Sequence, residues 1–384
     1  MDTLDRSDSS SEIVPRRGAR LRIAHVGSKG LPSRGGTERV VEAIAVRHAV
    51  EHDVTVYGSH RVCSSAMLDG IRVVALPVPS NKYLGPVVLD VLAALSALWQ
   101  GYDVVHVHGA ENAFVAPILR LRSRVVTTNH GPAYERQKWG SFARRLMRWI
   151  EGGSVRWASV ATAVAANQAA RLSEQYGVPV AYIPNGVDAN ISADTESAGH
   201  LLAANGLQAG EYVMFAAARV DPTKGCGTLI RAWRALGLDL PLLVVGDLWH
   251  APGHEAELRE AAEGGNAIFL PRIEDRATLL GLAAQSALFV FPSTVEAMSM
   301  MLLEVVSVGA RVIASDIPEN TLVLPQGFPV FRTGDEADLA RAMNAALEEP
   351  EDEARSRCDS YALGVRRTYD WDVIAAQYLE VYRS

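Results

Sequence analysis

Residues 287–309 read ALFVFPSTVEAMSMMLLEVVSVG and predict a strand, a loop and a helix in succession. The apolar run that ends at Phe291 is short enough for a buried strand. Ser299 is placed to cap an apolar helix over 300–307, and Gly309 is placed to end it. A buried strand followed by a buried helix is the repeating unit of a parallel α/β sheet.

Two carboxylates in this unit point to a function. Glu296 falls in the predicted loop, and Glu304 falls inside the predicted helix. A carboxylate beside the free N–H groups of a helix start can bind sugar hydroxyls while the amides bind a diphosphate. The pair therefore indicates a sugar-nucleotide site. The alternative is an ordinary amphipathic helix that carries two solvated glutamates.

The same alternation of apolar runs and helical patterns extends over the chain and predicts two successive parallel sheets with helices on both faces. We place the domain junction between 184–188 (PNGVD) and Gly210, because the stretch between them has turn chemistry and no strand pattern. This gives a polar tail over 1–20 and doubly wound domains over 21–195 and 210–365. Ligands of such sheets bind at the carboxyl ends of the strands. The predicted strands are 21–26, 54–57, 71–76, 104–107, 125–128, 160–163, 181–183, 212–217, 242–245, 268–270, 288–291, 312–314 and 330–331.

Composition limits the function classes. The 384 residues are 48% apolar and 21% charged, as in a globular protein, and the net charge of −7 gives no reason to expect nucleic-acid binding. Cys63, Cys226 and Cys358 are far apart and show no CxxC spacing, so a reducing compartment is expected. Residues 1–20 lack the apolar core of a secretory signal, and 87–99 is too short to span a bilayer. We expect a cytoplasmic protein, at most peripheral to a membrane.

The first predicted strand leads into the glycine-rich loop 27–36, GSKGLPSRGG. Gly35 and Gly36 leave backbone amides exposed at a helix start, where a phosphate can approach closely. The spacing fits neither a Walker loop nor GxGxxG. The alternative is a loop whose glycines serve only a turn.

A second anion site is predicted after the strand over 212–217. Arg219 and Lys224 flank a turn before the next helix, and together they could neutralise a leaving diphosphate. The alternative for Lys224 alone is a solvated surface lysine.

Histidines gather in the first half of the chain. His106 and His108 alternate on one face of a strand, and His130 ends the next strand. A metal site is conceivable for the pair, but spacing identifies no third ligand, so we favour hydrogen-bonded structural roles. His130 stands where the cleft should be, and it is a candidate sugar contact.

The segment 134–157 mixes basic and aromatic residues within an acidic chain. Helical spacing puts its large apolar side chains on one face and its arginines elsewhere. This face could rest on an anionic membrane or bind a phosphate-bearing acceptor, and core packing is an equal alternative. The apolar set is Phe142, Leu146, Trp149 and Ile150, and the basic set is Arg144, Arg145 and Arg148.

Together these motifs resemble the family 4 glycosyltransferases, which are retaining nucleotide-sugar enzymes of the GT-B fold. The likeness covers nearly the whole chain after residue 20, and 135–140 (ERQKWG) resembles a subgroup that builds bacterial surface polysaccharides. Residues 369–382 resemble the family's final helix, which implies that 366–384 returns to the first domain. The remaining matching segments are 35–39, 130–131, 184–188, 219–224, 296–304 and 314–320.

The resemblance implies a role for each matching residue. Arg219 and Lys224 would hold the donor diphosphate, Glu304 the ribose, and Glu296 the transferred sugar. Gly36, beside Gly35, would approach the phosphate from the other domain, and His130 would orient the reacting face of the sugar. The catalytic set is thus Glu296, His130, Arg219 and Lys224. Further donor contacts are expected from Arg272, Met298, Ser299 and Met300, and acceptor-side contacts from Glu38, Arg39, Arg136 and Lys138.

The implied reaction transfers a sugar from a UDP, GDP or TDP donor to an acceptor hydroxyl with retention, and needs no cofactor. The acceptor would be a saccharide, a lipid-linked saccharide or a small molecule such as an antibiotic aglycone. Asp370 and Asp372 could suggest a metal, but they begin the last helix, where aspartates serve as caps, so no metal is predicted. The family's Glu-Gly-Phe-Gly is Glu-Ala-Met-Ser at 296–299, which leaves the sugar open.

Other classes fit parts of the pattern. A nucleotide-sugar epimerase or phosphorylase would share the donor contacts, and a non-catalytic sugar-nucleotide binder would show binding without turnover. A dinucleotide-dependent dehydrogenase would share the doubly wound pattern, but an intact GxGxxG is absent. Oligomeric state is open.

Overall fold

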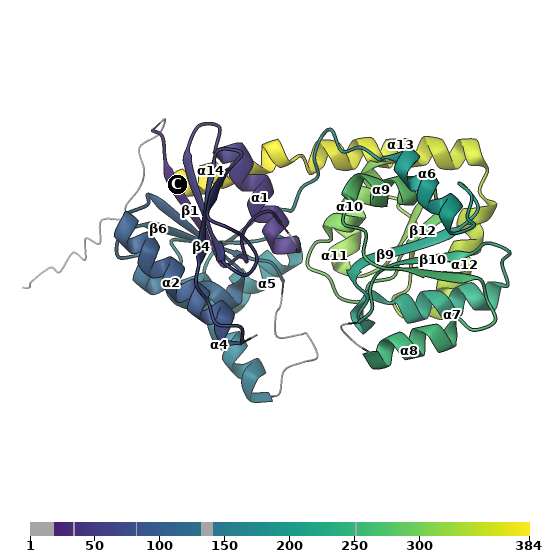
Figure 1. Ribbon diagram of the computed structural model, residues 1–384, viewed down its shortest axis with the longest axis horizontal. Helices are drawn as coiled ribbons and strands as arrows, with labels where there is room; N and C mark the ends of the chain where they lie inside the picture. The colour runs from purple at the N-terminus through teal and green to yellow at the C-terminus, as the bar shows by residue number, and fades with distance from the viewer. Residues whose placement is uncertain (1–18, 34, 82, 132–140, 250–251) are drawn as a thin grey trace, which may run out of the picture. The chain divides into compact units, whose positions relative to one another are not determined.

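The computed structural model describes residues 19–384 except 34, 82, 132–140 and 250–251. Of residues 141–144 and 252 it describes the backbone but not the side chains. The chain forms two compact units (Figure 1). Unit 1 comprises the residues up to Val164, Gln168–Ile183 and Ile374–Ser384, and unit 2 comprises Ala165–Asn167 and Pro184–Val373. Among the described residues, no helix is both long and apolar enough to cross a membrane.

The described part of unit 1 is built on an eight-stranded sheet with the order β3-β4-β2-β1-β5-β6-β7-β8. Every pairing is parallel except that of β3 with β4. The order reverses at β1, which lies between β2 and β5. The strands are β1 (Arg22–Val26), β2 (Asp53–Ser59), β3 (Ala66–Leu68), β4 (Ile71–Leu76), β5 (Val104–His108), β6 (Arg124–Asn129), β7 (Val160–Ala163) and β8 (Val180–Tyr182).

Helices cover both faces of this sheet (Figure 1). The last one, α14, packs on unit 1: the carbonyl of Ala375 and the Nε2 atom of His48 are 2.8 Å apart, and Arg124 Nε donates to the carbonyl of Val381 at 3.2 Å. The predicted return of the final helix to the first domain is confirmed. The helices are α1 (Gly36–His48), α2 (Leu84–Gln100), η1 (Ala110–Val115), α3 (Ala116–Leu119), α4 (Ser141–Arg156), α5 (Ala166–Tyr176) and α14 (Trp371–Arg383).

Unit 2 has a six-stranded, all-parallel sheet with the order β11-β10-β9-β12-β13-β14 in its described residues. The sheet winds outward from β9 in both directions, so its switch point lies between β9 and β12, where a doubly wound sheet leaves a crevice at its carboxyl edge. The strands are β9 (Val213–Arg219), β10 (Leu242–Asp247), β11 (Ala267–Leu270), β12 (Leu288–Phe291), β13 (Val312–Ser315) and β14 (Val330–Phe331).

The core of unit 2 forms where the helices pack on continuous apolar strands. Phe215 of β9, Val244 of β10 and Val290 of β12 are buried in one cluster with Trp233 of α7 and Met343 of α12. Burial of both sheet faces explains why these strands are uniformly apolar. The helices are α6 (Thr195–Ala204), η3 (Pro222–Lys224), α7 (Cys226–Leu236), α8 (Pro252–Ala261), α9 (Arg276–Ala284), α10 (Met300–Ser307), α11 (Pro318–Thr321), α12 (Glu336–Glu348) and α13 (Glu351–Thr368).

Helix α2 carries a buried acid, Asp90. Burial, reinforced by the Glu111 carboxylate, raises the pKa of Asp90 from its ordinary value of 3.8 to about 8. Between these two values the folded chain holds a proton that the unfolded chain releases, so this group makes folding less favourable as the pH rises.

Replacing Asp90 with asparagine is therefore expected to stabilise unit 1 more at pH 8 than at pH 5, with a difference on the order of 3 to 4 kcal/mol. Urea unfolding of the wild type and Asp90→Asn at both pH values measures the difference. An equal change at pH 5 and pH 8 would contradict the raised pKa.

Candidate functional site

The loops at the carboxyl edge of the unit 2 sheet are locked together beside the switch point. The carbonyl of Thr223, after β9, accepts the N–H of Thr294, after β12, at 2.8 Å, and also its hydroxyl at 3.2 Å. Gly225 has a φ of +70°, and a Cβ atom there would lie 2.0 Å from the carbonyl oxygen of Pro292. Glycine is therefore required for this close approach.

This interlock brings two predicted catalytic residues together. Lys224 Nζ and Glu296 Oε1 are 2.6 Å apart, and their side chains are 26% and 12% exposed. Asp221 holds the turn before Lys224 by accepting the N–H of Thr223 at 3.0 Å. An ammonium and a carboxylate side by side can serve a phosphate and a sugar hydroxyl at the same time.

The helix that follows is the predicted one. Helix α10 begins at Met300, and Ser299 caps it by accepting the N–H of Leu302 at 3.3 Å, so both predictions are confirmed. The carbonyl of Met298 accepts the side-chain amide of Asn185 at 3.0 Å. This contact gives the 184–188 motif a structural role in holding the loop before α10, which the sequence did not indicate.

Glu304 lies on the inner face of α10 and is 2% exposed. It forms an ion pair with Arg276, the first residue of α9. Sequence reasoning missed Arg276. The signal available was its position: it begins α9 directly after the helix cap Asp275, in the connection that follows β11, so it belongs to the same carboxyl edge as the loop between β12 and α10.

Two further predicted cations lie at this edge. Arg219 ends β9 with an exposed side chain, opposite Asp247 of β10. Arg272 follows β11, and its guanidinium is 3.3 Å from the exposed carboxylate of Glu274. Their roles toward a donor stay predictions.

In unit 1 the glycine-rich loop follows β1, also at the switch point of its sheet. Gly27 has a φ of +84°, and a Cβ atom there would lie 2.3 Å from the carbonyl oxygen of His108. Gly35 caps α1 and Gly36 begins it. The buried Glu38 accepts the N–H of Lys29 at 3.3 Å, so this carboxylate shapes the loop.

The acceptor-side predictions are untested. Arg39, in the first turns of α1, is partly buried. Arg136 and Lys138 lie outside the described residues. The roles of Glu38 and Arg39 toward an acceptor stay predictions.

The histidines of β5 are hydrogen-bonded inside unit 1, as we favoured. His106 Nδ1 is 2.7 Å from the hydroxyl of Tyr382 on α14, and its Nε2 is 2.6 Å from Thr128 Oγ1. His108 Nδ1 is 3.2 Å from Nε2 of the half-buried His130. His25 of β1 also belongs to this group, through its contact with His108, and the sequence pattern does not predict it.

Asp370 has the predicted capping role. Its Oδ1 atom accepts the N–H of Asp372 at 2.7 Å at the start of α14. Asp370, the first aspartate of the Asp-x-Asp pair, therefore serves as a helix cap.

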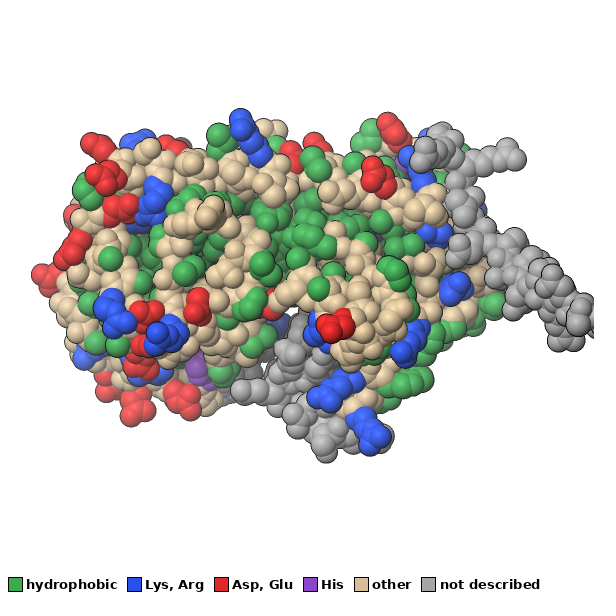
Figure 2. Space-filling view, turned by 180° about the vertical axis from the view of Figure 1, so that it is seen from behind, with side chains coloured by type: hydrophobic (Ala, Val, Ile, Leu, Met, Phe, Trp, Pro, Cys, Tyr) green, Lys and Arg blue, Asp and Glu red, His purple; other side chains and the backbone are tan. Residues whose placement is uncertain are grey.

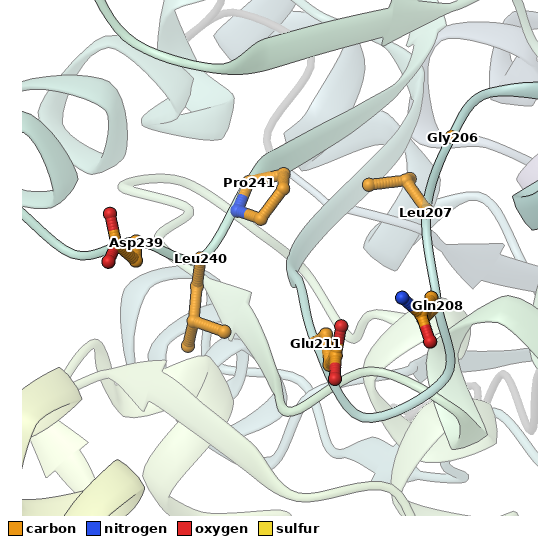
Figure 3. A pocket seen from close by; sticks show the side chains of 7 residues that line it. All are labelled: Gly206, Leu207, Gln208, Glu211, Asp239, Leu240 and Pro241. Atoms are coloured by element: carbon orange, nitrogen blue, oxygen red, sulfur yellow. The ribbon is translucent and has the colours of Figure 1, made fainter.

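A cavity of about 420 Å³ opens elsewhere on unit 2 (Figure 3). It is lined by the loops that precede β9 and β10, including Gln208, Glu211 and Asp239. These loops lie at the amino ends of the strands, whereas Lys224, Glu296 and Glu304 follow the carboxyl ends. The cavity is therefore separate from the candidate site.

Comparison with known families agrees with this arrangement. Residues 34–191 match the model described as Glycosyltransferase Family 4, and residues 200–364 match Glycosyl transferases group 1. The phosphatidyl-myo-inositol mannosyltransferase of Mycobacterium leprae is 27% identical over 74% of each chain. The alpha-maltose-1-phosphate synthase of Mycobacterium tuberculosis is 25% identical over 79% of this chain and 84% of its own.

Solved structures share the fold. Sucrose-phosphate synthase from Thermosynechococcus elongatus superposes with a TM-score of 0.79 at 20% identity, covering 95% of this chain and 98% of its own. Anabaena HepE in complex with UDP and glucose gives a TM-score of 0.76 at 21% identity, covering 94% and 99%. Two parallel-sheet units of this kind are the GT-B architecture.

Proposed function

Because this chain belongs to the family 4 glycosyltransferases, we propose that it moves a sugar from a nucleoside diphosphate to an acceptor hydroxyl with retention at the anomeric carbon. The observation that carries the proposal is the Lys224–Glu296 pair, 2.6 Å apart at the switch point of unit 2. Bacterial polysaccharide or glycoconjugate synthesis is the proposed setting. A soluble natural-product acceptor is the alternative.

In this proposal the cations bind the leaving group. Lys224 and Arg219 stabilise the charge that the diphosphate gains as the glycosidic bond breaks. The first N–H groups of α10 add a positive helix end near the same loop. The leaving diphosphate takes the acceptor proton, so neither a protein nucleophile nor a metal ion is needed.

The carboxylates recognise the donor's hydroxyls. Glu296 is proposed to contact the transferred sugar and Glu304 the ribose, with Arg276 holding the Glu304 carboxylate in place. Gly36 and His130 are proposed as the unit 1 residues for the phosphate and the sugar. The donor is proposed to be a UDP, GDP or TDP sugar, and the HepE complex with UDP and glucose makes a UDP sugar the first donor to try.

Donor binding tests the proposal directly. The melting temperature of the wild type is expected to rise with one of UDP, GDP or TDP, because a ligand of the folded state stabilises it. The rise should shrink in Lys224→Ala and Glu304→Ala, while ADP and NAD serve as comparison ligands. A rise with NAD alone, or equal rises in all three proteins, would contradict the proposed site.

We also propose that unit 1 contacts a membrane, which suits a lipid-linked acceptor. The outer face of α2 carries an apolar stripe whose members are 40 to 88% exposed. Their spacing of three or four residues puts them on one side of the helix. An exposed stripe of this size is typical of a docking surface. Its members are Leu84, Val87, Val91, Leu95 and Trp99.

Exposed cations and apolar groups also occur on other elements of unit 1. Arg122 donates to the carbonyl of Leu98 at 3.1 Å, which brings the exposed Leu121 to the end of α2. On α4, Trp149 is 64% exposed and Arg148 is also exposed, so the membrane interpretation of this helix fits better than core packing. Figure 2 shows that basic and apolar side chains are also interspersed on the face opposite to the view of Figure 1.

Membrane binding should depend on the stripe. The double variant Leu95→Ser/Trp99→Ser is expected to bind phosphatidylglycerol vesicles about tenfold more weakly, because less apolar surface enters the bilayer interface. Vesicle flotation measures the partition coefficient, and phosphatidylcholine vesicles show the part that needs anionic lipid. Leu322→Ser/Leu363→Ser removes exposed leucines of unit 2 as the matched control. Equal losses of vesicle binding in both double variants would contradict the proposal that the α2 stripe binds the membrane.

A further inference from the structure

Three imidazoles form a row across the carboxyl edge of the unit 1 sheet. His25 Nδ1 and His108 Nε2 are 2.9 Å apart, and His108 Nδ1 and His130 Nε2 are 3.2 Å apart. The ring centroids are 5.2 and 5.5 Å apart, with planes inclined by 28° and 17°. The rings therefore meet edge to edge, and His108 is hydrogen-bonded on both sides.

The geometry favours a hydrogen-bonded row over a metal site. Nitrogens of His25, His106 and His108 lie within 4.8 Å of one another, so a metal ion is the competing interpretation. However, the rings of His106 and His108 are tilted by 32° with centroids 3.9 Å apart, and their nitrogens have different hydrogen-bond partners. A metal would also have to take the lone pairs of His106 and His108, whose ring nitrogens all have hydrogen-bond partners.

The histidines in the row are neutral at physiological pH. Burial lowers the pKa of His25 to about 3, with a smaller effect from His48, and burial lowers the pKa of His130 to about 4. Burial also holds the pKa of His108 well below its ordinary value. Each bond in the row therefore joins one N–H to one lone pair.

In a row of neutral histidines, all the hydrogen bonds run from donor to acceptor in the same direction. His108 must donate on one side and accept on the other, because a neutral imidazole has one N–H. His25 Nε2 is buried and has no hydrogen-bond partner among the described residues. An orphaned N–H is rarer in proteins than an orphaned acceptor, so the favoured arrangement leaves a lone pair on this atom and the proton on Nδ1.

We propose that His25 and His108 are positioning residues that fix the tautomer of His130. His25 Nδ1–H donates to His108 Nε2, and His108 Nδ1–H donates to His130 Nε2. The proton of His130 is thereby held on Nδ1, where it is a neutral donor to a sugar hydroxyl oxygen. The sugar contact rests on the proposed function, whereas the tautomer does not.

Two variants at one position separate the two bonds. In His108→Asn the amide N–H replaces the Nδ1–H and can still donate to His130. In His108→Gln the amide oxygen lies near the former Nε2 and can still accept from His25, but His130 loses its donor. Each variant keeps one hydrogen bond, and the melting temperature of each shows whether it folds.

The first readout is the His130 tautomer. Long-range 1H–15N correlation of histidine-labelled protein distinguishes Nδ1–H from Nε2–H, and the His130→Asn spectrum identifies the His130 signals. We expect Nδ1–H in the wild type and His108→Asn, and a mixture or Nε2–H in His108→Gln. A wild-type His130 protonated on Nε2, or an unchanged tautomer in His108→Gln, would overturn the proposal.

The second readout is transfer. The kcat of His108→Gln is expected to fall about tenfold further than that of His108→Asn, with the donor KM little changed. Equal kcat in the two variants would overturn the link to the reaction. Absence of transfer in the wild type, with the expected tautomers intact, would refute the proposed function and leave the histidine row standing.

Discussion

Replacing Lys224 with alanine is expected to lower kcat/KM for sugar transfer by roughly 10²- to 10³-fold. Loss of one group that stabilises developing charge in a transition state typically has an effect of this size. Lys224 already lies 2.6 Å from Glu296, in a loop locked by Gly225 against Pro292, so its ammonium is held in place before a donor arrives. Initial rates at varied donor concentration measure the loss.

Two controls show whether Lys224→Ala acts by removing charge stabilisation of the leaving group or by disturbing the loop. Arg231, which pairs with Glu336 on the surface of unit 2, is the matched cation, and Arg231→Ala should change kcat/KM by less than about twofold, since exposed ion pairs contribute little. Lys224→Ala/Glu296→Gln tests whether the loss comes from leaving Glu296 without its partner. Less than a threefold effect of Lys224→Ala would remove Lys224 from the catalytic set.

Unit 1 is expected to lose on the order of 3 to 4 kcal/mol of stability between pH 6.5 and pH 5, from two buried histidines alone. Burial lowers the pKa of His25 from 6.5 to about 3 and that of His48 to about 4, and each effect exceeds the charge interactions with neighbouring histidines. Below pH 6.5 these two histidines bind protons in the unfolded chain but stay neutral in the folded chain. The stability that depends on these two neutral histidines is therefore fully present above pH 6.5, and it is lost as the pH falls.

Urea unfolding with pulsed hydrogen exchange follows the two units separately, with peptides of β5 for unit 1 and β9 for unit 2. Asp90 has the opposite pH dependence, so the experiment uses the Asp90→Asn background. His25→Asn keeps an amide donor toward His108 but does not titrate, and it should reduce the pH slope by up to about 1.4 kcal/mol per unit. A flat profile for β5 between pH 7.5 and 5 would contradict the buried neutral histidines.

Most of the fold follows from local pattern. Strand 288–291 is buried on both faces and is a continuous apolar run. The predictions 71–76, 160–163 and 330–331 also coincide with the strands observed, although Arg72 and Val330 are exposed. Strand β3 was missed because its residues are half-buried or exposed, and it pairs with β4 as a short antiparallel edge. Its three residues are apolar but too few to predict a strand, so its formation depends on pairing with β4.

The candidate site was predictable where residues close in sequence carry the chemistry. Ser299 and Glu304 lie on one helix, and Lys224 lies in a tight turn after a strand. Arg276 was not predictable in the same way, because its contact with Glu304 depends on how α9 packs beside α10. His25 was missed for a similar reason: the hydrogen bond to His108 joins residues 83 positions apart.

The return of α14 to unit 1 has a consequence for biosynthesis. Tyr382 is hydrogen-bonded to His106, which precedes it by 276 positions, and the carbonyl of Ala375 is hydrogen-bonded to His48. While the ribosome is still producing unit 2, α14 has not been made, so His48 and His106 of a nascent unit 1 lack these contacts. The unit that is translated first is the one that is completed last.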